Sequence, residues 1–242
     1  MSEPVRPARP HHRLTEDGRR MREVLTYARR GSRFTPRQQA AWDAYAGRYV
    51  IPDEAVDEPG FDLRGRFADP ARPLVVEIGC GIGEATAVLA AARPAYNVLG
   101  LEVWRPGVAD CAGRVGEAGL DNVRLCSVDA VWTLEHLVAE AELAEVWTFF
   151  PDPWPKKRHH KRRLVTPPHA RLVASRLAPG GCWRLATDWQ EYADAMVAVL
   201  DAEPLLEGGV VPRWSERPTT RFERKGLAAG RSITDLAYHR VG

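Results

Sequence analysis

The stretch LVVEIGCGIGEATAVLA at residues 74–90 has the pattern of a strand, a glycine-rich turn and a helix. The five residues before its first glycine are apolar apart from one acid, which is typical of a strand buried on both faces of a sheet. From this stretch to the carboxyl terminus, short apolar segments alternate with helical ones. The alternation predicts βαβ units, and therefore an α/β fold with a doubly wound, mostly parallel sheet of seven strands.

The elements of this pattern can be bounded approximately. The predicted strands are Leu74–Ile78, Asn97–Glu102, Val123–Asp129, Glu145–Phe150 and Cys182–Thr187. One or two further strands are expected near Leu205–Val211 and Thr234–His239. The predicted helices between them are Glu84–Ala92, Gly107–Ala118, Val131–Glu140, Pro168–Leu177 and Trp189–Asp201.

The length of the chain suits one domain of this kind. With 242 residues, 45% of them hydrophobic, it can fill one core and leaves little room for a second. Residues 1–21 are rich in proline, arginine and histidine, which predicts a disordered basic arm. Residues 22–242 then form a single domain that opens with a basic helical segment at about 25–51. A helix is expected to begin at Thr35–Pro36, because proline is favoured at the first helical position.

The cysteines and the hydropathy pattern bear on the compartment. The four cysteines are widely spaced and form no Cys-x-x-Cys pair, which favours reduced thiols in a cytoplasmic protein and gives no metal site. No apolar run approaches the ~18–20 residues of a membrane span, and the amino terminus has no apolar signal segment. The net charge of +2 is too small to select a partner, so local clusters of charge carry that information. The sequence does not decide between a monomer and a homodimer.

The glycine turn predicts a nucleotide site. Gly79, Gly81 and Gly83 let the backbone turn tightly and approach a ligand, and the next helix presents its amino terminus there. A dinucleotide fingerprint would need a third glycine where the chain has Glu84. The glycine spacing therefore favours a different nucleotide ligand over NAD, although a turn without any ligand is a further interpretation.

Three acids stand at or near the ends of the first three predicted strands. Glu77 precedes the glycine turn, Glu102 ends the second strand, and Asp129 ends the third. An acid at the second strand end can accept hydrogen bonds from both ribose hydroxyls of an adenosine. Glu77 would repel a pyrophosphate but suits the sulfonium and ammonium groups of S-adenosylmethionine, and Asp129 could bind an adenine amino group. The pattern therefore favours S-adenosylmethionine as the cofactor.

A fourth acid follows the fourth strand in the stretch FFPDPWPKKRHHKRR at residues 149–163. Ligands of α/β sheets bind at the carboxyl ends of the strands, so Asp152 should face the same crevice as the cofactor. Three neighbouring prolines restrict the loop and fix the position of the carboxylate. Trp154 offers a face on which a base could stack. A rigid loop whose acid caps a local turn is the alternative interpretation.

The cationic residues that follow this loop could neutralise several phosphates of a nucleic acid, although such a run can also be a solvated helix face. The predicted backbone contacts are Lys157, Arg158, Lys161, Arg162 and Arg163, together with Arg29, Arg30 and Arg33 near the amino terminus. Asp188 ends the fifth strand in the same crevice. The stretch RPTTRFERKG at residues 217–226 is expected to be non-helical, with side chains suited to a base edge, to a phosphate or simply to a surface loop.

These motifs resemble those of the bacterial tRNA (guanine-N7-)-methyltransferase family. The resemblance covers roughly Tyr27–Arg240, and FPDPWPKKRHHKRR is its most specific part. It implies a class I, Rossmann-like methyltransferase fold, S-adenosylmethionine as cofactor, and methyl transfer to N7 of a guanine in the variable loop of tRNA. The other matching motifs are ARRGSRFTPRQQ, EIGCGIGE, LGLEVWRPG, SVDA, LATDWQEYA and RPTTRFERKG. Cys80 and Trp104 stand where other residues are common in that family.

The resemblance also implies roles for individual residues. Cofactor contacts are implied for Glu77, Glu102, Asp129 and Asp152, and Asp152 is also the implied catalytic residue. Substrate contacts are implied for Lys156, Asp188, Thr220, Arg221, Phe222 and Glu223. Two alternatives stay open. An adenine-N6 methyltransferase carries an Asp-Pro-Pro-aromatic loop that Asp152–Trp154 partly matches, and a tRNA-binding protein or assembly factor could keep the fold without catalysis.

Overall fold

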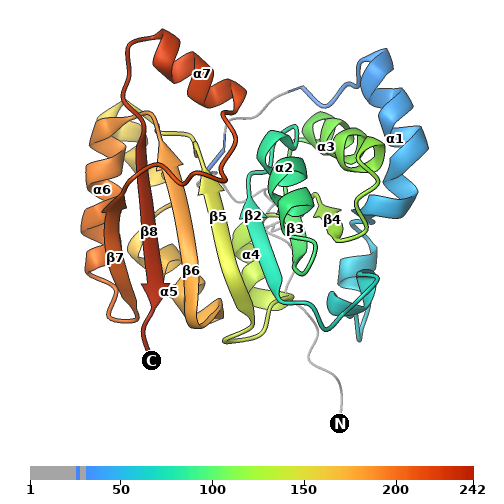
Figure 1. The fold of residues 1–242 in the computed structure, drawn as a ribbon, viewed down its shortest axis with the longest axis horizontal. Coiled ribbons are helices and arrows are strands. Elements are labelled where there is room, and N and C mark those ends of the chain that lie inside the picture. Colours follow the sequence, from blue (N-terminus) through green and yellow to red (C-terminus); the bar gives the residue numbers. More distant parts are fainter. Residues whose placement is uncertain (1–25, 28–30) are drawn as a thin grey trace, which may run out of the picture.

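Eight strands form one sheet in the computed structural model of the chain, which describes residues 26–27 and 31–242 (Figure 1). Their order across the sheet is β1-β4-β3-β2-β5-β6-β8-β7, and every neighbouring pair is parallel except those that β8 makes with β6 and β7. The strands are β1 (Val50–Ile51), β2 (Leu74–Ile78), β3 (Asn97–Leu101), β4 (Val123–Cys126), β5 (Leu143–Phe149), β6 (Leu177–Thr187), β7 (Leu206–Val211) and β8 (Thr234–Arg240). The predicted mostly parallel α/β sheet is confirmed.

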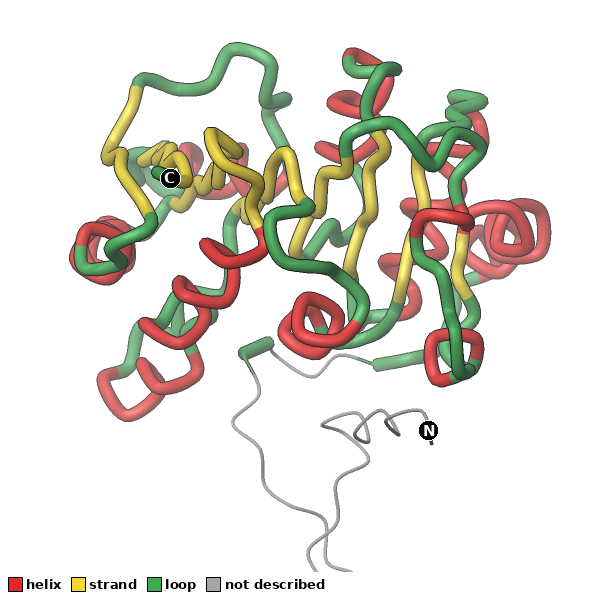
Figure 2. The backbone as a smooth tube through the Cα atoms, turned by 90° about the horizontal axis from the view of Figure 1, so that it is seen from below, coloured by secondary structure: helices red, strands yellow, loops and turns green. Residues whose placement is uncertain are grey.

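Helices cover both faces of this sheet, as the end-on view shows (Figure 2). Helices α1 to α3 pack together on one face, and α4 to α6 pack on the other (Figure 1). The helices are α1 (Pro36–Tyr49), α2 (Glu84–Ala92), α3 (Arg105–Glu117), α4 (Ala130–His136), α5 (Pro167–Arg176), α6 (Gln190–Asp201) and α7 (Arg221–Ala228). The predicted start of α1 is confirmed, because Thr35 caps it and forms a reciprocal capping box with Gln38.

Strand β2 is buried along its whole length, which explains its nearly continuous apolar sequence. Its successive side chains point to opposite faces of the sheet. Leu74, Val76 and Ile78 join the core that includes α4 to α6, whereas Val75 joins the core of α1 to α3. Each of these contacts removes apolar surface from water, and a fully buried aliphatic side chain contributes about 1.5–3 kcal/mol. The central strand therefore fixes both layers relative to the glycine turn that follows it.

Several features of the fold differ from the sequence prediction. Strand β6 begins at Leu177, five residues before the predicted Cys182, and α4 ends at His136, before the predicted Glu140. Strand β1 is an additional eighth strand, and its two residues are too few to give a periodic pattern. Strand β4 ends at Cys126, so Asp129 is the cap of α4 and not a strand residue. The expectation of a non-helical segment at residues 217–226 is wrong from Arg221 onward, because Thr220 caps α7 there. The helix has only eight residues and contains a glycine, so its helical signal in the sequence is weak.

Parts of the sequence prediction fall outside the residues that the structure describes. The predicted disordered arm at residues 1–21 lies there, as do Arg29 and Arg30. Arg33 is described and exposed. Within the described part of the chain, no helix is long and apolar enough to cross a membrane.

Candidate functional site

A cavity of about 420 Å³ opens at the carboxyl ends of the parallel strands. It lies beside β2, where the strand order reverses, because β3 and β4 follow on one side and β5 and β6 on the other. This reversal is the place where open α/β sheets bind their ligands. The lining combines the glycine turn after β2, the segments that follow β3, β4 and β5, and the first turn of α7.

The three glycines of the turn after β2 have a left-handed backbone. Gly79, Gly81 and Gly83 have φ values of 77°, 57° and 78°. At Gly83 a side chain is excluded a second time, because a Cβ atom there would lie 2.5 Å from Sγ of Cys111 on α3. The turn therefore packs directly against a neighbouring helix, and α2 begins at the next residue. This arrangement directs the first N–H groups of α2 toward the cavity.

Two of the predicted cofactor acids are held by backbone N–H groups. Glu102 accepts hydrogen bonds from the N–H of Gly81 at 3.0 Å and from the N–H of Trp104 at 2.8 Å. The Oδ1 atom of Asp129 accepts from the N–H groups of residues 131 and 132, which caps α4. A carboxylate oxygen has two lone pairs, so such bonds orient the group and leave capacity for a ligand. Both side chains are thus positioned before any ligand arrives.

Glu77 is the acid with the most unusual environment. Its side chain is 3% exposed, and it accepts a hydrogen bond from Oγ1 of Thr86 at 2.6 Å. Burial raises its pKa to about 7, with a further contribution from the nearby Glu102 carboxylate, while the Thr86 bond works in the opposite direction. A buried carboxyl with this pKa changes its charge near neutral pH, and a cationic ligand in the cavity would favour the ionised form.

Asp152 lines the same cavity from the loop that follows β5. Two residues of this loop other than glycine adopt a left-handed backbone, Phe150 with φ 53° and Trp154 with φ 46°. Such conformations cost about 1–3 kcal/mol each and cluster at functional sites. The indole N–H of Trp154 donates to the carbonyl of Thr26 at 3.0 Å, and the Arg162 guanidinium lies 3.5 Å from the centre of its ring. The ring of Trp154 therefore packs within the protein on at least one face, and Phe150 is the aromatic residue of this loop that lines the cavity.

The cationic residues after this loop have two different environments. Lys156, Lys157, Arg158 and Lys161 are exposed, and the last three belong to a 3₁₀ helix, η4 (Lys157–Arg162). Arg163 is instead 6% exposed and forms a bidentate ion pair with Glu191 on α6, while its Nε donates to the carbonyl of Pro153. Arg163 thus ties the loop to α6, and the exposed cations remain accessible to a phosphate backbone.

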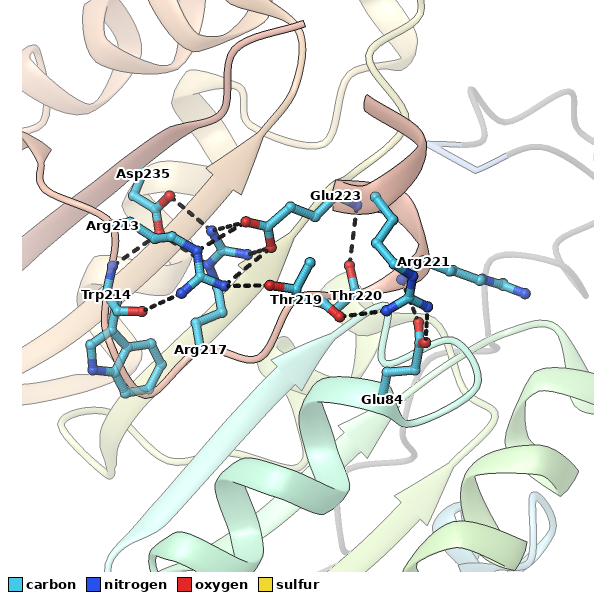
Figure 3. A network of polar contacts seen from close by, with 10 residues as sticks. Glu84, Arg213, Trp214, Arg217, Thr219, Thr220, Arg221, Glu223 and Asp235 are labelled. Carbon is cyan, nitrogen blue, oxygen red and sulfur yellow. Dashed lines mark hydrogen bonds and ion pairs between the residues drawn. The ribbon is translucent and has the colours of Figure 1, made fainter. Parts of the chain in front are cut away.

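The first turn of α7 forms another wall of the cavity. Thr220, Arg221 and Phe222 line it, whereas Glu223 is not among the lining residues. Glu223 is 2% exposed and pairs with Arg217 at 2.6 Å and with Arg213 at 2.9 Å (Figure 3). Arg217 in turn pairs with Asp235 on β8. The structure therefore places Glu223 in a buried ionic network that holds α7 in place.

Asp188 also contacts α7 and lies outside the lining of the cavity. It follows β6 and pairs with Arg231 at 3.0 Å, just beyond the end of α7. A Cβ atom at Gly226 of α7 would lie 2.8 Å from Asp188, so the helix approaches this residue closely. Of the predicted substrate residues, Thr220, Arg221 and Phe222 meet the cofactor acids at the cavity, while Lys156, Asp188 and Glu223 surround them.

Comparison with known proteins agrees with this geometry. The model of a family described as a putative methyltransferase matches residues 71–236. The tRNA (guanine-N(7)-)-methyltransferase of Nocardioides sp. is 72% identical over 238 residues, which cover 98% of this chain and 96% of that protein. The protein of the same name from Cutibacterium acnes is 49% identical over 91% of this chain and 84% of its own length. The chain belongs to the tRNA (guanine-N(7)-)-methyltransferase family.

A solved structure supports the fold of this family member. The aminoglycoside resistance methyltransferase NpmB1 superposes with a TM-score of 0.51 at 18% identity, covering 70% of this chain and 88% of that one. At this level of identity the likeness concerns the fold alone. The class I methyltransferase fold that the sequence motifs implied is thus confirmed.

Sequence reasoning about this family member missed several residues of the cavity wall. Thr26, Tyr27 and Ser32 precede α1 and line the cavity, although they lie far from the other motifs in the sequence. Side chains from other elements hold this segment through its backbone carbonyl groups. Trp104 donates to the carbonyl of Gly31 at 2.8 Å, and Arg162 donates to the carbonyl of Tyr27 at 3.0 Å. Bonds to carbonyl groups leave no trace in the sequence of the accepting residue. Over the described range 31–242 and residues 26–27, no cluster of histidine, cysteine or acids could hold a metal ion.

Proposed function

We propose that this protein transfers a methyl group from S-adenosylmethionine to N7 of a guanine in the variable loop of tRNA, giving 7-methylguanosine. The observation that carries the proposal is the convergence of four carboxylates, those of Glu77, Glu102, Asp129 and Asp152, on one cavity beside a glycine turn. The near full-length similarity to tRNA (guanine-N(7)-)-methyltransferases supports the choice of nucleic acid, base and atom.

The residues of the cavity fit S-adenosylmethionine, which joins an adenosine to a sulfonium and an ammonium group. Glu77 supplies a buried carboxylate for the cationic groups, and Glu102 supplies acceptors for the ribose hydroxyls. Asp129 caps α4 and lines the cavity, where it would accept from the adenine amino group. When bound, the cofactor supplies an electrophilic methyl group.

Asp152 is the proposed catalytic residue. Guanine N7 has a free lone pair and no proton, so its methylation requires no general base. The methylated ring is cationic, and a carboxylate fixed beside it stabilises the positive charge that develops in the transition state. The same carboxylate can accept hydrogen bonds from guanine N1–H and the exocyclic amine. The restricted loop around Asp152 fixes this group in advance, which lowers the entropic cost of orienting the base.

The exposed cations after the loop are proposed to bind the tRNA backbone. Lys156, Lys157, Arg158 and Lys161 lie next to Asp152 in the sequence and on the surface, so phosphates held there would bring a nucleotide to the cavity. Arg33 is a further exposed cation in the segment before α1. A cytoplasmic location is also proposed, because all four cysteines are buried and unpaired, as expected in a reducing compartment.

The test is methyl transfer to unmodified tRNA, followed by mass spectrometry of the digested nucleosides. The wild-type protein should form 7-methylguanosine, and Asp152→Ala should lower kcat by about a hundredfold or more while changing the Kd of S-adenosylmethionine far less. Asp152→Asn is the matched control, because it keeps the shape and removes the charge. A different methylated nucleoside would overturn the choice of base, for example in favour of adenine N6. Cofactor binding without any transfer would support a tRNA-binding protein, and normal turnover by Asp152→Ala would overturn the role of that residue.

A further inference from the structure

Helix α7 lies across the carboxyl ends of the strands, above the sheet in the view of Figure 1. Its first turn lines the cavity, but the chain attaches the helix to the sheet only through β7 before it and β8 after it. The position of this turn relative to the cofactor site therefore depends on side-chain contacts. Those contacts come from two separate parts of the fold.

One contact comes from Glu84, the first residue of α2 and the residue that follows the glycine turn. Its Oε2 atom accepts a hydrogen bond from the backbone N–H of Arg221 at 2.7 Å. Its Oε1 atom pairs with the guanidinium of Arg224 at 2.8 Å. Arg224 also donates to the carbonyl of Thr219 at 2.7 Å, so its guanidinium links the residue before the cap of α7 to the Glu84 carboxylate.

The surroundings of Glu84 favour its ionised form. The Glu84 side chain is 19% exposed, and burial alone would raise its pKa. The hydrogen bonds from Arg221 and Arg224 outweigh that effect and hold the pKa of Glu84 below its ordinary value. Charge-assisted hydrogen bonds are about twice as strong as neutral ones, so this contact holds the start of α7 more strongly than neutral hydrogen bonds would.

The other contact is the buried network around Glu223. Glu223 pairs with Arg217, and Arg217 pairs with Asp235 on β8 at 2.9 Å. This network attaches Glu223, the third residue of α7, to the antiparallel side of the sheet, whereas Glu84 attaches the N–H of Arg221, the first residue of the helix, to the glycine turn (Figure 3). Loss of Glu84 should consequently leave α7 folded and anchored at Glu223, with only the residues before Glu223 less firmly held.

We infer that Glu84 is a positioning residue, which holds the Thr220–Phe222 edge of α7 against the cofactor turn so that a guanine base meets it in one orientation. The inference rests on the proposed function, because it assigns Glu84 to the nucleic-acid side of the same reaction. It also explains why a side chain stands where a dinucleotide site would need glycine. The competing explanation is purely structural, since an acid in the first turn of α2 stabilises that helix through its dipole.

The test compares Glu84→Ala, Glu84→Gln, Arg224→Ala and the double variant Glu84→Ala/Arg224→Ala. We expect Glu84→Ala to lower kcat/KM for tRNA by about tenfold or more, because it removes charge-assisted bonds, while the Kd of S-adenosylmethionine changes by less than about twofold. Glu84→Gln keeps an acceptor for the N–H of Arg221 and should restore part of the loss. Arg224→Ala should have little further effect in the Glu84→Ala background, since the two residues act through one contact.

Each contrary result overturns the inference in a distinct way. A Kd for S-adenosylmethionine that weakens as much as kcat/KM falls would make Glu84 a cofactor contact. Losses that add in the double variant would separate Glu84 from Arg224 and α7. A lower Tm that accounts for the loss, with no rescue by Glu84→Gln, would leave only the structural role. The wild-type protein is measured in the same assay. If only the inference is wrong, the wild-type protein still transfers the methyl group. If the wild-type protein transfers none, the proposed function and this inference are both overturned.

Discussion

The cavity has two halves, which are built in different ways. The proposed cofactor half comprises Glu77, the glycine turn, Glu102 and Asp129. The proposed substrate half comprises Asp152, the first turn of α7 and the exposed cations that follow Asp152.

On the cofactor half, backbone N–H groups hold two of the acids. Glu102 is held by the glycine turn after β2 and by the N–H of Trp104, and Asp129 is held by the first turn of α4. Gly83 is packed against α3. On the substrate half, Asp152 lies in a loop fixed by side chains from distant segments, such as Arg163 with Glu191. Backbone hydrogen bonds at the ends of the parallel strands fix Glu102 and Asp129 before a ligand binds. Long charged side chains from several elements instead form a surface suited to a large polyanion.

This difference separates two kinds of mutational effect. Changes on the cofactor half should alter the Kd of S-adenosylmethionine and leave the salt dependence of tRNA binding unchanged. Changes on the substrate half should do the reverse. The following variants test that separation, beginning with the one expected to have the largest effect.

Gly83→Ala should abolish measurable cofactor binding and destabilise the protein. The new Cβ would lie 2.5 Å from Sγ and 2.9 Å from Cα of Cys111, and the backbone has a φ of 78°. Overpacking costs about 1–3 kcal/mol and a left-handed conformation about 1–2 kcal/mol, so a loss of about 3 kcal/mol is expected in the free energy of unfolding. Urea denaturation and cofactor titration measure the two effects.

Gly119→Ala is the matched control for that variant. Gly119 also has a positive φ, 64°, but a Cβ there meets nothing within 4 Å. It should lose only about 1–2 kcal/mol and bind S-adenosylmethionine normally. Equal destabilisation by both variants would show that the close contact with Cys111 is unimportant, and normal cofactor binding by Gly83→Ala would contradict the role of the turn.

Glu102→Ala should weaken the binding of S-adenosylmethionine by about tenfold to a hundredfold. It removes the acceptor that fixes the N–H groups of Gly81 and Trp104, and a hydrogen bond to a charged group contributes about 1.5–3 kcal/mol. Calorimetric titration gives the Kd. The Kd of Glu102→Gln, which keeps one acceptor, should lie between that of the wild-type protein and that of Glu102→Ala. At saturating cofactor the KM for tRNA should change little. A rise in that KM comparable to the change in Kd would argue against a separation of the two halves.

The cofactor half is also the half that the sequence predicts well. Glu77, the glycines and Glu102 belong to one strand–turn–helix–strand unit, so their spacing fixes their geometry before the rest of the fold is known. The bounds of β2 and β3 were predicted to within one residue for the same reason, because each is a separate apolar run, whereas β6 begins five residues earlier than predicted. Asp129 caps α4 and still lies near the end of β4, although that strand ends earlier than expected.

The substrate half could not be predicted in the same detail. Nothing in KKRHHKRR distinguishes the buried Arg163 from its exposed neighbours, because the difference depends on Glu191, a residue of another helix. Likewise, the arginines of RPTTRFERKG form ion pairs with Glu84 and Asp235, which lie far away in the sequence. Thr26 and Tyr27 are held at the wall by bonds from Trp154 and Arg162 to their carbonyl groups, which every residue has. Long-range pairing of this kind appears only once the fold brings the segments together.

The exposed cations of the substrate half provide the third test. The triple variant Lys157→Ala, Arg158→Ala and Lys161→Ala should raise the KM for tRNA by about tenfold at low salt and flatten the plot of log K against log salt by about two units. The reason is that each phosphate contact releases about 0.7–0.9 of a counterion. The Kd of S-adenosylmethionine should remain unchanged.

Three exposed arginines outside this segment, Arg48, Arg66 and Arg171, serve as a control with the same change in net charge. Their replacement by alanine should leave the salt slope close to that of the wild-type protein. If both triple variants flatten the slope equally, overall charge and not the segment after the loop determines tRNA binding. Arg163 is left intact in both, because its loss would release the loop from α6.

The smallest expected effect concerns pH and Glu77. With a pKa of about 7, raised mainly by burial and further by Glu102, this carboxyl is partly protonated at neutral pH, and the neutral form cannot attract a cation. If the cationic cofactor binds only the ionised form, its affinity should rise by about threefold between pH ~6.5 and ~7.5, and Glu77→Gln should lose that dependence. The comparison with Glu77→Gln subtracts protons that belong to the ligand itself. An affinity that rises equally in both proteins would mean that Glu77 is not the titrating group, and an affinity that falls with pH in the wild-type protein alone would mean that the cofactor meets the protonated carboxyl.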